Sequence, residues 1–121
     1  MMPRVMIVDD DEFLHKVMSR ILALGGYEVV AHAYNGLEAY KMYAKLEPPP
    51  DVVLMDHRMP IMNGTQATRE IRRIDPSARV LFVSADESAE SEAYQAGAAG
   101  FLVKPLRSTE LFDALKRVLE E

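Results

Sequence analysis

The sequence predicts a doubly wound α/β fold, in which helices cover both faces of a five-stranded parallel sheet. Four short apolar runs have the composition of strands buried on both faces: residues 5–8, 52–55, 80–83 and 101–103. The segments between these runs are long enough to hold crossover helices, so we expect parallel strands. Parallel strands place their carboxyl ends at one edge of the sheet, where α/β proteins build their sites.

The elements of this fold alternate along the chain. In order, we predict strands at 5–8, 28–33, 52–55, 80–83 and 101–103 and helices at 12–24, 36–46, 66–74, 88–95 and 109–119. After the first strand, apolar residues recur at helical spacing until Gly25-Gly26 end the helix. Asn35 stands in the cap position of the second helix, with Glu38 at capping-box spacing, and the prolines from Pro48 onward end that helix.

The second half of the chain has equally clear boundaries. Gly64 introduces the third helix, and Pro76 lies in the turn before the fourth strand. Gly97 ends a shorter and more polar fourth helix. Pro105 directly follows the fifth strand, and Ser108 is expected to cap the last helix. For the sheet we predict the flavodoxin-like strand order 2-1-3-4-5, with five helices.

Length and composition limit the classes of function. The 121 residues, 49% of them hydrophobic, predict a single domain over 1–121 with an ordinary core. The formal net charge of −5 provides no basic field for nucleic acid or an anionic membrane. The chain has no cysteine, which excludes disulfides, thiol catalysis and Cys-based zinc sites. With no run of membrane-spanning length, we expect a cytoplasmic protein that binds neither nucleic acid nor membranes directly.

Acidic side chains follow the first and third strands. In the predicted order these strands are neighbours at the point where the crossovers change faces, so Asp9, Asp10 and Asp56 are expected to share a crevice. Carboxylates this close repel one another unless a hard divalent cation lies among them, and Mg²⁺ suits such ligands. Alternatively, residues 9–11 cap the helix that follows and interact with its dipole. That alternative leaves Asp56 unexplained.

Ser84 and Lys104 lie where the fourth and fifth strands end, facing the same crevice. Taken alone, each has the ordinary interpretation of a loop serine or a solvated lysine. Together they supply a hydroxyl donor and a cation for the oxygens that carry charge in phosphoryl transfer. The combination predicts a phosphoryl site beside a metal. The sequence leaves open whether the Lys104–Pro105 peptide is cis or trans.

Short motifs in a fixed order carry a resemblance to a known family: Val8-Asp9-Asp10, Met55-Asp56, Met59-Pro60, Asn63-Gly64, Val83-Ser84-Ala85, Ala96-Gly97-Ala98 and Val103-Lys104-Pro105. By these motifs the chain resembles, over essentially its whole length, the CheY-like receiver domain of two-component response regulators. The resemblance implies a signalling switch that catalyses only its own phosphorylation and dephosphorylation. It also implies two kinds of partner: a sensor histidine kinase or histidine phosphotransfer protein, and a downstream effector protein or domain.

The resemblance further implies a role for each acidic residue. Asp56 would be the phosphoacceptor, attacking a phosphohistidine or a small phosphodonor. Mg²⁺, or Mn²⁺ in its place, would bind Asp10 and Asp56 directly and Asp9 mainly through water. The backbone carbonyl of Arg58 would complete the protein ligands. The position of Arg58 and that of Asp86 flank the path of the hydrolytic water in receivers. The two side chains either pair over the acyl phosphate, prolonging its lifetime, or remain separately solvated.

By the same resemblance, Ser84 and Lys104 would contact the phosphoryl group, and the readout would involve Ser84 and the aromatic residue at position 101. Ser84 would move toward the phosphoryl group and Phe101 would turn inward, which remodels the face made by the fourth helix, fifth strand and fifth helix. CheY has a tyrosine where this chain has Phe101, and a phenyl ring cannot donate a hydrogen bond. The alternative is that Phe101 simply packs in the core.

Other interpretations fit the sequence less well. Aspartate-nucleophile phosphatases share an Asp-x-Asp motif, and here the second position of that motif is Arg58. A flavodoxin would hold a phosphate directly after the first strand, where three acids would repel it. A receiver-like interaction module that is never phosphorylated would not need the complete set of site residues. The histidines, His15, His32 and His57, lack metal-ligand spacing and are expected to be at the surface or partly buried.

Overall fold

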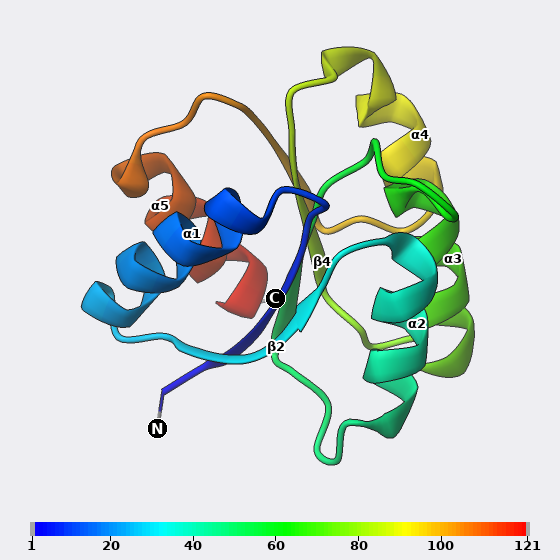
Figure 1. Cartoon of the computed structure of the whole chain (residues 1–121), viewed down its shortest axis with the longest axis horizontal. Helices are drawn as coiled ribbons and strands as arrows, with labels where there is room; N and C mark the ends of the chain where they lie inside the picture. Colours follow the sequence, from blue (N-terminus) through cyan, green and yellow to red (C-terminus); the bar gives the residue numbers. More distant parts are fainter. Residues whose placement is uncertain (1, 121) are drawn as a thin grey trace.

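A five-stranded parallel sheet with helices on both faces forms the body of the protein (Figure 1). The structure is a computed structural model that describes residues 2–120. Its elements are β1 (Arg4–Val8), α1 (Glu12–Leu24), β2 (Glu28–Ala33), α2 (Gly36–Lys45), β3 (Val52–Met55), α3 (Gly64–Ile74), β4 (Val80–Ser84), the 3₁₀ turn η1 (Glu87–Ala89), α4 (Glu90–Gln95), β5 (Gly100–Val103) and α5 (Ser108–Glu120). The strand order is β2-β1-β3-β4-β5 and all neighbouring pairs are parallel. The predicted fold class and strand order are confirmed.

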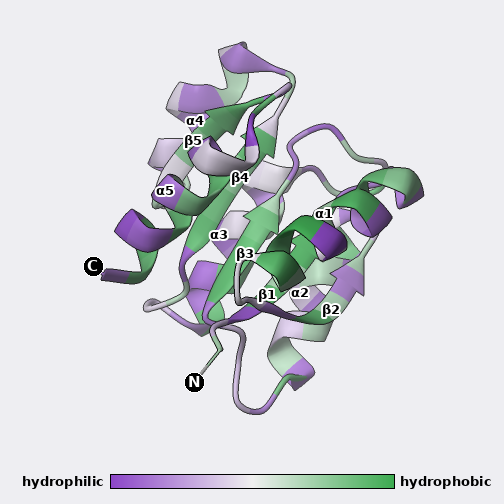
Figure 2. Ribbon diagram, turned by 90° about the vertical axis from the view of Figure 1, so that its left-hand side faces the viewer, coloured by the Kyte–Doolittle hydropathy of each residue, from purple (hydrophilic) through white to green (hydrophobic). Residues whose placement is uncertain are grey.

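Alternate residues of the buried strands face opposite helix layers. In β1, Val5 and Ile7 pack into a cluster with α1 and α5, whereas Met6 and Val8 pack into a second cluster with α2, α3 and α4. This alternation follows from the two-residue period of a strand. Figure 1 shows the same division of the helices between the two sides of the sheet. In Figure 2 the hydrophobic strands lie between helices that carry hydrophilic residues, which explains the continuous apolar runs of the central strands.

The starts of three helices differ from those predicted: α3 begins two residues earlier, at Gly64, and the fourth and fifth helices also begin differently. The fourth helix is split into η1 and a six-residue α4, because the Asp86 carboxylate accepts a hydrogen bond from the Ser88 N–H and caps the 3₁₀ turn. Ser108 is the first residue of α5 rather than its cap, and the Glu110 carboxylate binds the Arg107 N–H at the helix start. Within residues 2–120, no helix is long and apolar enough to cross a membrane. The cytoplasmic location stays a prediction.

Candidate functional site

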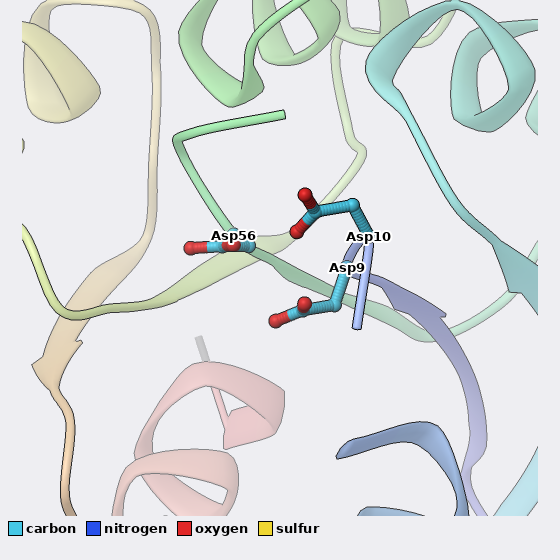
Figure 3. A group of neighbouring side chains, drawn as sticks. All are labelled: Asp9, Asp10 and Asp56. Atoms are coloured by element: carbon cyan, nitrogen blue, oxygen red, sulfur yellow. The ribbon is translucent and has the colours of Figure 1, made fainter. Parts of the chain in front are cut away.

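Three carboxylates meet at the carboxyl edge of the sheet, where β1 and β3 end side by side (Figure 3). Val8 is paired with Met55, and the Asp56 N–H donates to the Val8 carbonyl at 2.9 Å, so the residues after the two strands emerge together. Oxygens of Asp9, Asp10 and Asp56 all lie within 4.8 Å of one another. Asp9 and Asp56 are buried, whereas Asp10 is exposed. The structure therefore contains the predicted acidic crevice.

The capping alternative applies to the third acid of the triplet. Asp11 is the N-cap of α1, and its carboxylate accepts a hydrogen bond from the Phe13 N–H at 3.0 Å. The Asp11 N–H in turn donates to Asp9 Oδ1 at 2.8 Å. Asp11 thus stabilises the start of the helix and orients Asp9, which leaves the first two acids facing Asp56.

Ser84 and Lys104 join the same site. Lys104 Nζ lies 2.8 Å from Asp9 Oδ2 and 3.8 Å from Asp56 Oδ1. The Lys104 N–H donates to the Ser84 carbonyl at 2.9 Å, which ties the end of β5 to β4, and the Lys104–Pro105 peptide is cis. The Ser84 side chain is buried, and its hydroxyl accepts a hydrogen bond from the Asp86 N–H at 3.1 Å. A cavity of about 370 Å³ is lined by Asp56, Arg58, Ser84, Ala85, Asp86 and Lys104.

The electrostatics of the site favour a bound cation. Loss of solvation, together with the negative charge of Asp9, raises the pKa of Asp56 from 3.8 to about 6. Lys104 opposes this rise, as does the His57 N–H, which donates to Asp56 Oδ1 at 2.8 Å. A divalent ion among the three carboxylates would offset their repulsion, and hard oxygen ligands are those that Mg²⁺ prefers. The acidic cluster therefore fits a magnesium ion.

The backbone behind Asp56 is tightly packed. A Cβ atom at Gly64 would collide with the Asp56 carbonyl oxygen, and the Gly64 N–H donates to the His57 carbonyl at 2.8 Å. Asn63 caps α3 through a complete capping box with Gln66. Glycine at position 64 therefore lets α3 begin directly against the loop that carries Asp56.

Two further predictions concerned the Arg58–Asp86 pair and Phe101. Arg58 Nε lies 3.2 Å from Asp86 Oδ2, so these side chains form the ion pair that the sequence left open. Phe101 is partly buried and stacks on Phe82, with ring centroids 5.9 Å apart and the planes at 15°. The packing role of Phe101 is thus present in the structure, and its movement as a switch stays a prediction.

The expectation for His15 was wrong, whereas His32 and His57 are partly buried as predicted. His15 is 2% exposed, and its Nδ1 lies 2.8 Å from His32 Nδ1 across α1 and β2. Sequence spacing gave no sign of this contact. One signal was available: His15 shares a helical face with Met18 and Leu22, three and seven residues later, and both are buried core residues.

The chain matches the family model of the response regulator receiver domain over residues 5–116. It belongs to this family. The receiver domain is 43% identical to the chemotaxis protein CheY of Thermotoga maritima over 117 residues, covering 95% of this chain and 96% of the relative. It is 42% identical to CheY of Bacillus subtilis over 118 residues, covering 96% and 97%. The resemblance seen in the motifs is confirmed.

Solved structures resemble this receiver domain closely. CheY in a CheX–CheY–BeF₃–Mg complex from Borrelia burgdorferi superposes with a TM-score of 0.90 at 32% identity, covering 96% of this chain and 88% of the other. The receiver domain of a Pseudomonas aeruginosa sensor histidine kinase has a TM-score of 0.89 at 26% identity, with full coverage of both chains. That structure has a magnesium ion coordinated in its active-site cleft.

Proposed function

We propose that this receiver domain accepts a phosphoryl group on Asp56 from the phosphohistidine of a sensor histidine kinase or a histidine phosphotransfer protein, in a Mg²⁺-dependent reaction in the cytoplasm. One observation carries the proposal. The buried Asp56 carboxylate lies within 4.8 Å of two further carboxylates and 3.8 Å from the Lys104 ammonium, and Asp56 and Lys104 line one cavity. Phosphoryl transfer depends on such positioning and charge neutralisation.

In the proposed step, an oxygen of the Asp56 carboxylate forms a bond to phosphorus while the phosphorus–nitrogen bond of the phosphohistidine breaks. The leaving imidazole takes up a proton from solvent. The ionised carboxylate is a far stronger nucleophile than the protonated acid, and a pKa of about 6 leaves Asp56 mostly ionised at pH 7. Water later attacks phosphorus, which releases phosphate and restores the carboxylate. Over one cycle the domain therefore returns to its starting state.

Lys104 and Ser84 are the proposed contacts of the phosphoryl oxygens. Lys104 Nζ already lies between Asp9 and Asp56, at 2.8 Å and 3.8 Å from their carboxylate oxygens. An anionic group on Asp56 would attract this ammonium further, because its charge exceeds that of the carboxylate it replaces. The Ser84 hydroxyl accepts from the Asp86 N–H, so its own proton is available to donate to a phosphoryl oxygen.

The proposed direct ligands of Mg²⁺, or of Mn²⁺ as a substitute, are Asp10, Asp56 and the Arg58 carbonyl, and Asp9 would hold the ion mainly through water. When bound, the ion supplies positive charge that reduces the repulsion between these acids and an incoming phosphoryl group. Asp9 keeps its carboxylate in place through two hydrogen bonds, from the Asp11 N–H and from Lys104 Nζ, both at 2.8 Å. The exposed Asp10 carboxylate remains accessible from solvent.

The proposed output is a change in the face made by α4, β5 and α5. Ser84 ends β4, and Phe101 on the neighbouring β5 stacks on Phe82 of β4, so a movement of Ser84 has a short route to Phe101. A downstream effector would bind the changed face. The domain acts as a switch, and the chemistry it catalyses is limited to its own phosphorylation and dephosphorylation.

The proposal is tested by treating the protein with acetyl phosphate and Mg²⁺ and measuring its intact mass. We expect wild type to gain one phosphoryl group, which hydroxylamine then removes because it cleaves acyl phosphates. Asp56→Asn should gain none. A gain in Asp56→Asn would refute Asp56 as the sole acceptor. A wild type that gains no mass with any phosphodonor would instead be an interaction module that is not phosphorylated.

A further inference from the structure

Each polar group of Asp9 has a partner in the structure. Its N–H donates to the Ala33 carbonyl at 3.1 Å, and its two carboxylate oxygens accept from the Asp11 N–H and Lys104 Nζ. Its backbone carbonyl lies 2.7 Å from His15 Nε2. The position of Asp9 is therefore determined by β2, α1 and the end of β5 together. His15 is the side chain through which α1 reaches the backbone of Asp9.

The His15 ring is itself fixed by its neighbours. It is 2% exposed, its Nδ1 lies 2.8 Å from His32 Nδ1, and the Tyr34 ring is 4.3 Å away between centroids, at an interplanar angle of 31°. His32 lies on β2, directly paired with Ile7 of β1. The His15 imidazole is thus held against β2, the edge strand of the sheet.

Hydrogen-bond chemistry determines where the protons lie in this chain. A carbonyl oxygen only accepts, so His15 Nε2 must carry the proton that it shares with Asp9. Neutral His15 then has its lone pair on Nδ1, and His32 Nδ1 donates to it. The chain runs from the His32 N–H to His15 and from the His15 N–H to the Asp9 carbonyl. Each of the three ring nitrogens in this chain is therefore either a donor or an acceptor.

We propose that His15 is a positioning residue for the metal site, acting through the peptide that joins Asp9 to Asp10. The Asp9 carbonyl and the Asp10 N–H belong to one planar peptide group. By holding that carbonyl, His15 sets the orientation of the plane and hence the direction in which the Asp10 side chain leaves the backbone. His32 supports this role by fixing the His15 ring. The inference rests on the proposed binding of Mg²⁺ by these acids.

A leucine and a glutamine at position 15 separate positioning from packing. His15→Leu fills the same region without a donor, whereas His15→Gln places an amide N–H the same number of bonds from Cα as Nε2. We expect calorimetric titration with MgCl₂ to give a Kd raised about tenfold in His15→Leu, the size typical of lost outer-shell contacts. His15→Gln should keep a Kd near that of wild type. At saturating Mg²⁺, His15→Leu should be phosphorylated by acetyl phosphate at nearly the wild-type rate.

His32 supplies a second test. His32→Leu should raise the Mg²⁺ Kd less than His15→Leu does, and it should have no further effect in the His15→Leu background, because it acts only through His15. Ser19→Ala, one turn further along α1, is the matched control and should keep the wild-type Kd. Should His15→Leu not fold, an unchanged Kd in His32→Leu would overturn the proposal.

The outcomes distinguish this inference from the proposed function. If wild type does not bind Mg²⁺, or if Asp10→Asn does not abolish the binding, the proposed metal site itself is wrong. If wild type binds Mg²⁺ through Asp10 but His15→Leu has the same Kd, the metal site stands and the positioning role of His15 is overturned. Equal loss of affinity in His15→Leu and His15→Gln would show that the ring packs the helix rather than orienting Asp9, and would also overturn it.

Discussion

Arg58 Nε lies 3.2 Å from Asp86 Oδ2, which joins the loop after β3 to the loop after β4 at the rim of the cavity beside Asp56. The Arg58 side chain is 82% exposed and that of Asp86 is 19% exposed. The hydrogen bond from Ser88 and the Arg58 guanidinium hold the pKa of Asp86 below its usual range, so the pair is ionised at neutral pH. Exposed pairs of this kind contribute little to stability. We propose instead that the long Arg58 side chain hinders the approach of water to an acyl phosphate on Asp56.

We expect this ion pair to prolong the life of the phosphorylated state. Arg58→Ala and Asp86→Ala should each shorten the phosphoryl half-life, because either change frees the approach to the acyl phosphate. The phosphorylated double variant should decay no faster than the faster-decaying single variant, since both changes remove the same interaction. The measurement is the loss of the added mass after the phosphodonor is removed. Unchanged decay rates, or strictly additive effects of the two changes, would contradict the proposal that this ion pair slows hydrolysis.

Asp86 also caps η1, so its replacement needs a control. The Asp86 carboxylate accepts from the Ser88 N–H at 3.1 Å and from the Ser88 hydroxyl. Ser88→Ala removes the hydroxyl contact but keeps the partner of Arg58. We expect Ser88→Ala to decay at the wild-type rate. Faster decay in Ser88→Ala would show that the η1 turn, rather than the ion pair, controls access of water.

Ile61 is held in an unfavourable backbone conformation. Its φ is 72°, in the left-handed region that β-branched residues avoid, and its side chain is 77% exposed. Ile61→Asn should stabilise the protein by about 1 kcal/mol, because Asn tolerates this region and little apolar burial is lost. Urea unfolding measures the change. Ile74→Asn, at an exposed helix end, is the control and should not stabilise. An equal or lower unfolding free energy in Ile61→Asn would refute the expected strain.

Much of the site could be predicted because strand ends are local features of the sequence. A buried strand needs a continuous apolar run, and the polar residue that follows marks its end, as at Asp56 and Lys104. Parallel pairing then brings those ends to one edge, whatever the details of the loops. This explains why the acids, the serine and the lysine could be placed together before their distances were known.

Contacts between helix faces and edge strands are harder to predict. The His15–His32 contact depends on the rotation of α1 about its axis and on the pairing of Ile7 with His32. Neither quantity follows from local composition. The split of the fourth helix into η1 and α4 depends on a single cap at Asp86, a contact that helical spacing does not encode. Loop pairs such as Arg58 with Asp86 depend in the same way on tertiary structure.

Mg²⁺ should stabilise the folded protein. Free ion at about tenfold above its Kd is expected to add about 1.4 kcal/mol to the unfolding free energy, because the ion binds the folded state. Asp10→Asn should raise the melting temperature without Mg²⁺, since it removes one of three mutually repelling carboxylates, and should abolish the effect of the ion. Thermal unfolding with and without MgCl₂ measures both changes.

Asp11→Asn is the matched control for this prediction. Asn also caps helices, so the start of α1 is preserved while one negative charge beside the cluster is removed. Asp11→Asn should still be stabilised by Mg²⁺. If Asp10→Asn responds to Mg²⁺ as strongly as wild type does, the ion binds elsewhere.

The raised pKa of Asp56 makes stability depend on pH in a defined window. Folding raises this pKa from 3.8 to about 6, so the folded state favours the protonated form. The resulting contribution to stability is fully present below pH 3.8 and is lost as the pH rises through about 6. Without Mg²⁺, the unfolding free energy of wild type should therefore fall relative to that of Asp56→Asn over this window. Urea unfolding at a series of pH values measures the difference, in which the titration of carboxylates distant from Asp56 cancels.

Removal of Lys104 and addition of Mg²⁺ should move this window in opposite directions. Lys104 lowers the pKa of Asp56, so Lys104→Met should extend the loss of stability to higher pH. Mg²⁺ competes with the proton for the same carboxylate, so saturating ion should shift the window toward lower pH, and its affinity should fall by up to about tenfold per pH unit well below the raised pKa. The two shifts have one electrostatic cause, the excess negative charge among the three acids. A difference between wild type and Asp56→Asn that stays constant from pH 4 to pH 7 would show that folding leaves the pKa of Asp56 unchanged, and that burial and neighbouring charge do not raise it.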